Sequence, residues 1–319
     1  MSEYPQVTRD DVLAASDRVS AAVLLTPLIE TEIRGRRLWL KCECLQTGGS
    51  FKLRGATNRL ALLSAEERER GVVAFSSGNH AQGVAIAAKR LGIRAIIVMP
   101  SDAPKLKIEG TRAQGAEITL YDRRSEDRVA IAARIGAETG ATVVPSFDDP
   151  HIVAGQGTVG LEILDQLAEA GASPPARIVV NCGGGGLSAG IALACPDAEI
   201  VPVEPDGWDD MLRSLEKGAI VPVGPGAPPT MCDAIQTPLV SPITFGILLG
   251  RGASGIAVSD EEVADAVRWA WQEHGLTVEP GGAASIAAIL SGKVEIVPET
   301  VVVVSGGNID PALHARLIA

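Results

Sequence analysis

A run of four glycines is the pattern in this sequence that points most directly to ligand chemistry. Gly183, Gly184, Gly185 and Gly186 follow the apolar segment IVVN, and a helical pattern opens at Leu187. Residues without a Cβ atom let backbone N–H groups turn towards an anion, and a helix start adds its positive dipole end. The alternative is a tight turn with positive φ angles, which rarely needs four consecutive glycines. The run therefore predicts a phosphate-binding loop.

The same glycines also fit a second kind of phosphate ligand. Gly184, Gly186 and Ala189 match the G-x-G-x-x-A fingerprint of dinucleotide-binding folds. Glu204 ends the next apolar segment, where an acid that binds a ribose would lie. On this motif alone an NAD-dependent oxidoreductase is the main alternative, although a single match of this kind is weak evidence.

A lysine in apolar surroundings is the candidate nucleophile. Lys52 lies in SFKLRGA, among apolar and small residues and directly after the Gly48-Gly49 turn. Partial desolvation would lower the pKa of its ammonium group and make the neutral amine available as a nucleophile or base. Taken alone, the motif favours the plainer interpretation of an exposed lysine at the start of a helix.

Two further polar turns follow apolar segments. SSGNH (76–80) presents backbone N–H groups, two hydroxyls and an amide, which suit a ligand carboxylate or a ring oxygen. A plain helix cap by Ser77 or Asn79 explains this turn equally well. SGGN (305–308) follows the segment VVVV and by itself indicates only another turn.

Alternating apolar and helical segments predict how these motifs are positioned. Short strands that alternate with helices indicate βαβ units and a parallel sheet, in which ligands bind at the carboxyl ends of the strands. Each motif above lies at such an end. We expect strands at 71–77, 94–100, 116–122, 141–147 and 300–308, and helices at 80–92, near 103–114, near 125–139, at 260–275 and near 282–291. Residues 176–205 are expected to form a strand, the glycine turn, a helix and a second strand.

The two stretches of this pattern meet near residue 148 and predict two α/β domains. We expect residues 1–65 and 149–319 to form a large cofactor-binding domain, and residues 66–148 to form a small domain that contacts the substrate. The first 60 or so residues are assigned to the large domain because Lys52 must meet the later motifs in space.

The composition argues against several classes of partner. A net charge of −11 disfavours nucleic acid and anionic membranes. No apolar segment approaches the roughly 18 residues of a membrane span, and the first residues do not resemble a signal peptide, so we expect a cytoplasmic enzyme. Five cysteines without a CxxC pair indicate reduced thiols. Cys42 and Cys44 alternate along an apparent strand and are expected to pack there as small hydrophobic residues.

Together the motifs closely resemble those of the fold-type-II pyridoxal-phosphate enzymes, in the serine/threonine dehydratase and serine racemase family that includes β-hydroxyaspartate dehydratases. An NAD-dependent oxidoreductase would require neither SFKLRGA nor SSGNH. The resemblance implies a tryptophan-synthase-β-like α/β fold with mostly parallel sheets, bound pyridoxal 5'-phosphate and a homodimer. The shared segments, nearly end to end and in the family's order, are SFKLRGA, SSGNHAQGVA, AGQGTVGLEI, GGGGLSAGIA, EPDGWDD, VEPGGAASIA and VVSGGN.

The resemblance also implies roles for single residues around the cofactor. Lys52 would bind it as a Schiff base, next to Phe51, and would serve as the base that removes the substrate's Cα proton. Asn79 would hydrogen-bond the ring 3-oxygen, and residues 183–187 would hold the phosphate. Ser305 would face the pyridine nitrogen, where a hydroxyl does not force protonation and therefore favours elimination.

On the substrate side, the resemblance assigns Ser76, Ser77, Asn79 and His80 to the α-carboxylate, and Glu279 to the cofactor's surroundings. The expected reaction is β-elimination from L-threonine or L-serine, giving a 2-oxo acid and ammonia. Ser77 occupies the position of the second acid/base of the racemases, where dehydratases often carry alanine. Some β-hydroxyaspartate dehydratases share this serine, so racemisation and a dicarboxylic substrate stay open as alternatives.

EPDGWDD matches the cation site of part of the family. Glu204, Asp210 and the backbone carbonyl of Trp208 would be its protein ligands. These are hard oxygen donors, which suit Mg²⁺, Ca²⁺ or Mn²⁺ better than zinc. The alternative is a solvated acidic turn.

Overall fold

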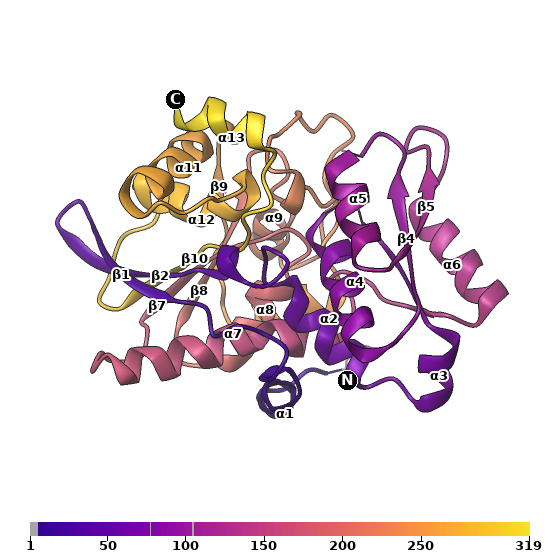
Figure 1. The fold of residues 1–319 in the computed structure, drawn as a ribbon. Helices are drawn as coiled ribbons and strands as arrows, with labels where there is room; N and C mark the ends of the chain where they lie inside the picture. The colour runs from indigo at the N-terminus through magenta and orange to yellow at the C-terminus, as the bar shows by residue number, and fades with distance from the viewer. Residues whose placement is uncertain (1–5, 77, 104) are drawn as a thin grey trace.

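Two sheets organise the chain, and a computed structural model describes residues 6–76, 78–103 and 105–319 of it (Figure 1). Every pair of neighbouring strands is parallel except β1 and β2. The larger sheet consists, in spatial order, of β1 (Leu28–Ile33), β2 (Arg36–Lys41), β10 (Thr300–Val303), β7 (Arg177–Asn181), β8 (Glu199–Pro205) and β9 (Ile256–Val258). The smaller sheet consists of β5 (Glu117–Tyr121), β4 (Ala95–Pro100), β3 (Val72–Phe75) and β6 (Thr142–Val143).

Helices flank both sheets, which confirms the predicted α/β class. In Figure 1 the smaller sheet and its helices lie on the right, and the larger sheet lies on the left. None of the helices in the described ranges combines the length and the apolarity that crossing a membrane requires. The helices are α1 (Arg9–Val19), α2 (Lys52–Ala61), α3 (Ala65–Arg70), α4 (Asn79–Leu91), α5 (Lys105–Ala113), α6 (Arg128–Thr139), α7 (Pro150–Glu169), α8 (Gly186–Ala194), α9 (Asp210–Lys217), α10 (Pro242–Gly250), α11 (Asp260–His274), α12 (Pro280–Leu290) and α13 (Pro311–Ile318), with short 3₁₀ helices η1 (Glu43–Leu45) and η2 (Asp233–Ile235).

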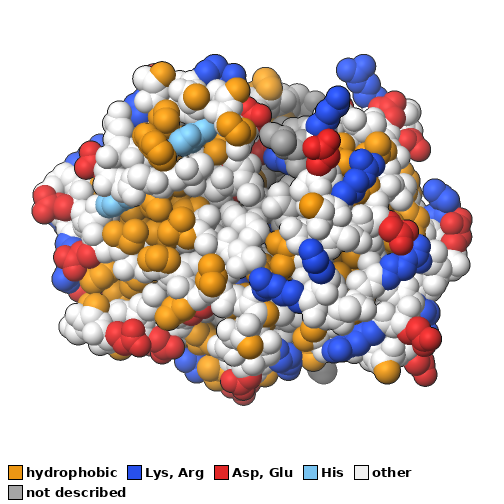
Figure 2. Space-filling model, in the orientation of Figure 1, with side chains coloured by type: hydrophobic (Ala, Val, Ile, Leu, Met, Phe, Trp, Pro, Cys, Tyr) orange, Lys and Arg blue, Asp and Glu red, His pale blue; other side chains and the backbone are white. Residues whose placement is uncertain are grey.

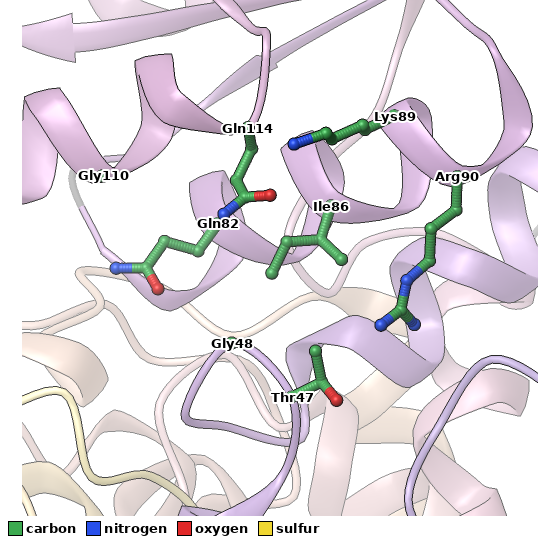
Figure 3. Close-up of a pocket in the computed structure, with 8 residues that line it drawn as sticks. All are labelled: Thr47, Gly48, Gln82, Ile86, Lys89, Arg90, Gly110 and Gln114. Atoms are coloured by element: carbon green, nitrogen blue, oxygen red, sulfur yellow. The ribbon is translucent and has the colours of Figure 1, made fainter.

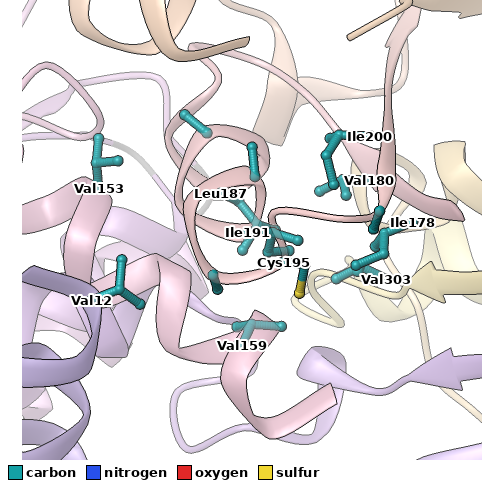
Figure 4. Packing of buried hydrophobic residues seen from close by; sticks show 14 of the residues in the cluster. Val12, Val153, Val159, Ile178, Val180, Leu187, Ile191, Cys195, Ile200 and Val303 are labelled. Atoms are coloured by element: carbon teal, nitrogen blue, oxygen red, sulfur yellow. The ribbon is translucent and has the colours of Figure 1, made fainter. Parts of the chain in front are cut away.

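Both faces of the larger sheet are buried, because its side chains alternate between two hydrophobic cores. Ile178, Val180 and Val303 point to the core that contains residues of α1, α7, α8 and α10 (Figure 4). Val179 and Val302 point to the other core, with α11 and α12. This packing fixes the register of the central strands, and with it the position of the turns at their carboxyl ends.

The helix that carries Lys52 joins the two sheets. Leu53 and Leu60 of α2 pack in the same core as Val72 and Ala74 of the smaller sheet. The other sides of α2 contact α4 and α7. The position of Lys52 therefore depends on packing from both halves of the molecule.

Several predicted strands end earlier than expected, and the strand expected at 300–308 ends at Val303. The strand expected at 141–147 is only two residues long, because Pro145 cannot donate a ladder hydrogen bond and the chain then turns towards a cavity. Strand β2 ends at Lys41, so placing Cys42 and Cys44 along a strand was wrong. Cys42 precedes η1 and Cys44 lies within it, although both are buried in a hydrophobic core as expected.

We propose the division into domains that the sequence pattern predicts, with residues 1–65 and 149–319 in one domain and 66–148 in the other. Sheet membership supports this proposal. The smaller sheet uses strands between residues 72 and 143, whereas β1 and β2 join the larger sheet with the late strands.

Candidate active site

A cavity of about 570 Å³ opens at the carboxyl ends of β3, β6, β7 and β10. It is the place where the motifs singled out from the sequence come together. Among the residues that line it are Phe51, Lys52, Ser76, Gly78, Asn79, His80, Asn181, Gly183, Gly184, Gly185, Gly186, Leu187, Glu279 and Ser305. Ser77 lies outside the described residues.

Lys52 is the first residue of α2 and is partly buried, at the wall of this cavity. Its Nζ donates to the carbonyl of Ser146 at 3.2 Å and lies 5.1 Å from the centre of the Phe51 ring. Burial lowers the pKa of Lys52 to about 8, although the nearby Glu279 carboxylate opposes this change. A substantial fraction of the amine is therefore neutral near pH 8 and available as a nucleophile or base.

Asn79 and Glu279 form a hydrogen-bond chain along one wall of the cavity. The Asn79 Nδ2 donates to Glu279 Oε1 at 2.5 Å, and Asn79 Oδ1 accepts from Asn308 Nδ2 at 2.8 Å. These two bonds fix the orientation of the Asn79 amide and leave its second N–H available to a ligand oxygen. Burial, together with the charge of Asp233, raises the pKa of Glu279 to about 7.

This pKa predicts how stability should depend on pH. The folded-state pKa of Glu279 lies above its ordinary value of 4.5, so the folded protein binds more protons between these values. The contribution of this group is present at low pH and is lost as pH rises through about 7. Between pH 4.5 and pH 8 we expect the free energy of unfolding of Glu279→Gln to rise by about 3 kcal/mol relative to that of wild type. Urea unfolding of both proteins at the two pH values measures this, and parallel pH profiles would contradict it.

The glycine loop connects β7 to α8. Gly185 is the N-cap of α8 and has a φ angle of +83°, which L-residues rarely adopt. A Cβ atom on Gly184 would lie 2.3 Å from the Phe147 ring, and one on Gly183 would lie 2.8 Å from Thr237 Oγ1. The loop therefore needs glycine for both conformation and space, and it leaves the first N–H groups of α8 facing the cavity.

Ser305 is held in place by Asn181, a residue that the sequence analysis did not single out. Asn181 ends β7, and its Nδ2 donates to Ser305 Oγ at 3.0 Å. Its Oδ1 accepts from the Ser285 N–H at 2.6 Å, which fixes the amide orientation. Because Ser305 Oγ already accepts this bond, its own hydrogen is directed elsewhere and can be donated to an acceptor in the cavity.

His80 is neutral in this site. Burial and the charge of Lys52 lower the pKa of His80 to about 3, and Nε2 lies 2.9 Å from the carbonyl oxygen of Val144. A neutral ring that donates to a backbone carbonyl offers no positive charge to a carboxylate. Any contribution of His80 to binding an anion therefore comes from its backbone N–H in the first turn of α4, near Ser76.

The residues predicted to bind a cation lie beneath the glycine loop. Glu204 is buried and accepts the N–H groups of Met211 and Leu212 at 3.0 and 2.8 Å. Asp210 is also buried, and neither of its carboxylate oxygens has a hydrogen-bond partner. Burial raises the pKa of Asp210 to about 7, and burial with the Asp210 charge raises the pKa of Glu204 well above its usual range.

These two carboxylates fit a cation, because both are buried and the Asp210 oxygens have no hydrogen-bond partner among the described residues. Over the same residues, no group of three or more His, Cys, Asp or Glu side chains is arranged to hold a metal. A cation here would therefore depend on Glu204, Asp210 and a backbone carbonyl. Trp208 lies between the two acids, and its indole N–H donates to the Pro228 carbonyl at 2.8 Å, which holds this turn in place.

A second cavity, of about 470 Å³, adjoins the turn that precedes Lys52. Gln82 and Ile86 extend into it from α4 (Figure 3). Its two basic residues already contact backbone carbonyls, Lys89 that of Ala113 and Arg90 that of Ala22. Thr47, Gly48, Gly110 and Gln114 complete its lining.

Comparisons with known proteins decide the family. The model of the pyridoxal-phosphate dependent enzyme family matches residues 19–307. The chain belongs to this family. The L-threonine ammonia-lyase of Thermotoga maritima is 39% identical, and the alignment covers 98% of this chain and 78% of the ammonia-lyase. The L-threo-3-hydroxyaspartate ammonia-lyase of a Pseudomonas species is 38% identical, with 97% of each chain covered. The structure of maize serine racemase matches with a TM-score of 0.91 at 34% identity, covering 98% of this chain and 97% of that one.

The cavity of this pyridoxal-phosphate enzyme fits its cofactor. Lys52 offers a partly neutral amine for a Schiff base, and the glycine loop and the N-terminus of α8 offer N–H groups to a phosphate. Asn79 retains one N–H for a ring oxygen, and Ser305 retains its hydroxyl hydrogen for a ring nitrogen. The predicted cofactor residues thus lie together, whereas their individual roles stay predictions.

Proposed function

We propose that this enzyme eliminates water from a β-hydroxy amino acid, L-threonine or L-serine, and so releases a 2-oxo acid and ammonia. The observation that carries the proposal is the convergence of Lys52, Asn79, Ser305 and the glycine loop on one cavity. Relatives named as ammonia-lyases over nearly the whole chain support it.

The side chains of the cavity suit this chemistry. When bound, the cofactor supplies an electron sink for negative charge that develops at the substrate Cα. Lys52 Nζ would remove the Cα proton, and its lowered pKa makes the neutral amine accessible at moderately alkaline pH. The free N–H groups at the start of α4, with Ser76, would orient the α-carboxylate. We also propose that Ser77 contributes to binding the α-carboxylate.

Ser305 favours elimination over reactions that need a stronger electron sink. Its hydroxyl accepts a hydrogen bond from Asn181 and would donate its own hydrogen to the ring nitrogen. A hydroxyl at this position would not force the ring nitrogen to be protonated, so the cofactor would be a weaker electron sink. Departure of the β-hydroxyl removes the negative charge that develops at Cα.

A dicarboxylic substrate, β-hydroxyaspartate, is the second candidate. Two cationic side chains, Lys107 and Arg128, line the cavity with Lys52. Lys107 is paired with Asp233 at 3.0 Å, whereas Arg128 lies over the Phe75 ring at 5.8 Å. Either could face a distal carboxylate. Racemisation through Ser77 is the remaining alternative, supported by the likeness to maize serine racemase.

The assay that tests the proposal offers the purified yellow enzyme L-serine, L-threonine and both L-β-hydroxyaspartates. It follows 2-oxo acid release and the enantiomer composition of each amino acid. Release from L-threonine or L-serine supports the main proposal, and release only from a β-hydroxyaspartate replaces it with the second candidate. Enantiomer exchange without oxo acid would make the enzyme a racemase.

We also propose that Glu204, Asp210 and the Trp208 carbonyl bind Mg²⁺ or Ca²⁺. We expect EDTA to lower the unfolding temperature, and a cation at 100 times its Kd to restore about 2.7 kcal/mol. Asp210→Asn should remove this response, because the neutral amide loses the charge that holds the cation. Differential scanning calorimetry with and without Mg²⁺ measures the effect. An Asp210→Asn protein that responds like wild type would contradict the site.

Finally, we propose a cytoplasmic homodimer. Leu24, Leu25 and Leu45 are exposed by 52, 64 and 46%, and the Leu24 N–H donates to Gln46 Oε1, which joins the two segments that carry them. Figure 2 shows further hydrophobic side chains gathered beside the β1–β2 hairpin. Exposed apolar surface of this kind suits a second copy of the chain. Sedimentation equilibrium would contradict the proposal by giving a monomer mass.

A further inference from the structure

Four charged side chains are buried together behind Lys52. We name them the Arg54 cluster: Lys41, Glu43, Arg54 and Glu162. Lys41, Glu43 and Arg54 have no exposed surface, and the Glu162 side chain is 18% exposed. Two positive and two negative charges make the cluster neutral overall. Such a group is costly to bury, so its retention in the core calls for a reason.

Arg54 is the centre of this cluster. Its Nε and Nη2 donate to the two carboxylate oxygens of Glu43, both at 2.8 Å. Its Nη1 and Nη2 donate to the two oxygens of Glu162 at 2.6 and 2.8 Å. The guanidinium thus holds two carboxylates, each in a bidentate pair, which only one orientation of the planar group allows. Burial would lower the pKa of Arg54, but the charges and hydrogen bonds of Glu43 and Glu162 together outweigh it and raise the pKa.

The cluster connects α2 to β2, to η1, to α7 and to the segment before β1. Glu43 lies in η1, directly after β2, and Glu162 lies in α7. Lys41 Nζ donates to Glu162 Oε2 at 2.6 Å and to the Thr26 carbonyl at 2.8 Å. Since Arg54 is two residues after Lys52 on α2, these contacts set the rotation and the depth of the helix turn that carries Lys52.

Apart from Arg54, the first turn of α2 has one buried hydrogen bond to a side chain of another described element, from the Gly55 N–H to Gln156 Oε1 at 3.1 Å. Its N-cap is Phe51, whose side chain makes no capping hydrogen bond. A side-chain cap normally fixes the first turn of a helix, and here that contribution is missing. The backbone N–H of Phe51 contacts the Ser305 carbonyl at 3.3 Å, a long hydrogen bond. Side-chain contacts from Arg54 therefore supply much of the restraint.

We propose that the Arg54 cluster is a positioning device for Lys52. It holds Nζ at the depth and angle at which the amine meets the cofactor and the substrate Cα. The inference rests on the proposed role of Lys52, and it makes Arg54 a positioning residue, not a catalytic one. The buried charges do not need to stabilise the fold, because apolar residues of similar volume would do so at least as well.

Arg54→Lys tests this proposal, because lysine keeps the charge but cannot hold two carboxylates in bidentate pairs. We expect kcat to fall by roughly 10- to 100-fold, as for a misplacement of about 1 Å, while KM stays within about threefold. We also expect a weaker affinity for pyridoxal phosphate and a displaced visible absorbance maximum. The cofactor affinity and the absorbance maximum are both independent of which amino acid the enzyme converts.

Arg59→Lys is the matched control on the same helix. Arg59 lies seven residues beyond Lys52 and donates through Nε to Asp149 at 2.9 Å, in a pair that is also largely buried. We expect this variant to lose a similar amount of thermal stability without its cofactor, but to keep kcat and the absorbance maximum of wild type. Equal losses of kcat in the two variants, or a wild-type spectrum in Arg54→Lys, would overturn the proposal.

Glu162→Gln keeps the test valid if Arg54→Lys does not fold. Glutamine keeps one acceptor for Arg54 Nη1 but loses the charge that Nη2 and Lys41 share. The same shifts in spectrum and kcat are expected, with smaller size, and their absence would overturn the proposal. Wild-type enzyme that converts no β-hydroxy amino acid would refute the proposed function instead, and the cofactor readouts would still test the cluster.

Discussion

Replacing Lys52 by alanine is expected to lower 2-oxo acid release by about 10⁴-fold or more. The variant loses the amine that would bind the cofactor covalently and that would remove the substrate's Cα proton. Among the described residues, Glu279 and His80 are the titratable groups whose charges interact with that of Lys52, and neither replaces its amine. Burial keeps Glu279 largely protonated below pH 7, and a pKa of about 3 makes His80 a weak base. Steady-state oxo acid release measures the loss, and the visible spectrum of the purified protein measures the missing Schiff base.

Lys89→Ala is the control for this experiment. Lys89 lies on α4, lines the second cavity and contacts the Ala113 carbonyl at 3.4 Å. The Lys89→Ala substitution removes a lysine that does not line the first cavity. The visible absorbance and the turnover should therefore remain within about twofold of wild type. A Lys52→Ala protein that stays yellow and active would mean that another amine binds the cofactor. The proposed roles of Lys52 would then be wrong.

The sequence pattern predicted the parts of this molecule that short-range rules control. Alternation of apolar strands and helices predicted the parallel sheets, and glycine or serine turns after strands predicted where a ligand would bind. The glycine loop and Ser305 lie on one cavity because parallel strands bring their carboxyl ends to the same edge of a sheet, whereas Lys52 reaches the cavity from the start of α2. The α/β class and the family are confirmed by the fold and by the similarity to known enzymes.

Contacts between distant residues could not be predicted in this way. Glu279 is 200 positions from Asn79, and Asn308 is 229 positions from it, yet the three form one hydrogen-bond chain. Asn181 was visible only as a polar residue at the end of IVVN, and that position was the one signal that could have identified it. The same holds for Arg54, which SFKLRGA places beside Lys52 without indicating that its partners come from η1 and α7.

The failed strand predictions have local causes. Period-two alternation at Cys42 and Cys44 looks like a strand, but η1 begins at Glu43, whose carboxylate is drawn inward by Arg54. A buried ion pair thus overrides the local pattern. At 141–147, Pro145 ends the ladder and sends Phe147 back towards the glycine loop. In both cases the strand ends before a side chain, Glu43 or Phe147, that packs near the start of α2 or the glycine loop.

The glycine loop provides the second large effect. Gly185→Ala is expected to weaken the affinity for pyridoxal phosphate by roughly 10- to 100-fold. A side chain at φ +83° is strained, and its Cβ would lie 2.7 Å from Met211 Cε and 3.0 Å from Thr244 Cβ. Because Thr244 Oγ1 donates to the Gly184 carbonyl at 2.8 Å, any shift that relieves this contact also moves the loop. Fluorescence titration of the cofactor-free protein with pyridoxal phosphate measures the affinity.

Gly171→Ala separates loop geometry from backbone strain. Gly171 has a similar φ of +71°, but no atom lies within 4 Å of the position its Cβ would take. Alanine at position 171 should therefore lower the free energy of unfolding by about 1–2 kcal/mol through backbone strain, as alanine at position 185 also should. The cofactor affinity of Gly171→Ala should stay at the wild-type value. If both variants bind pyridoxal phosphate equally well, strain alone explains the stability loss and the phosphate is held elsewhere. A loss confined to Gly185→Ala means that the phosphate depends on the exact path of the backbone between β7 and α8, which only glycine can follow there.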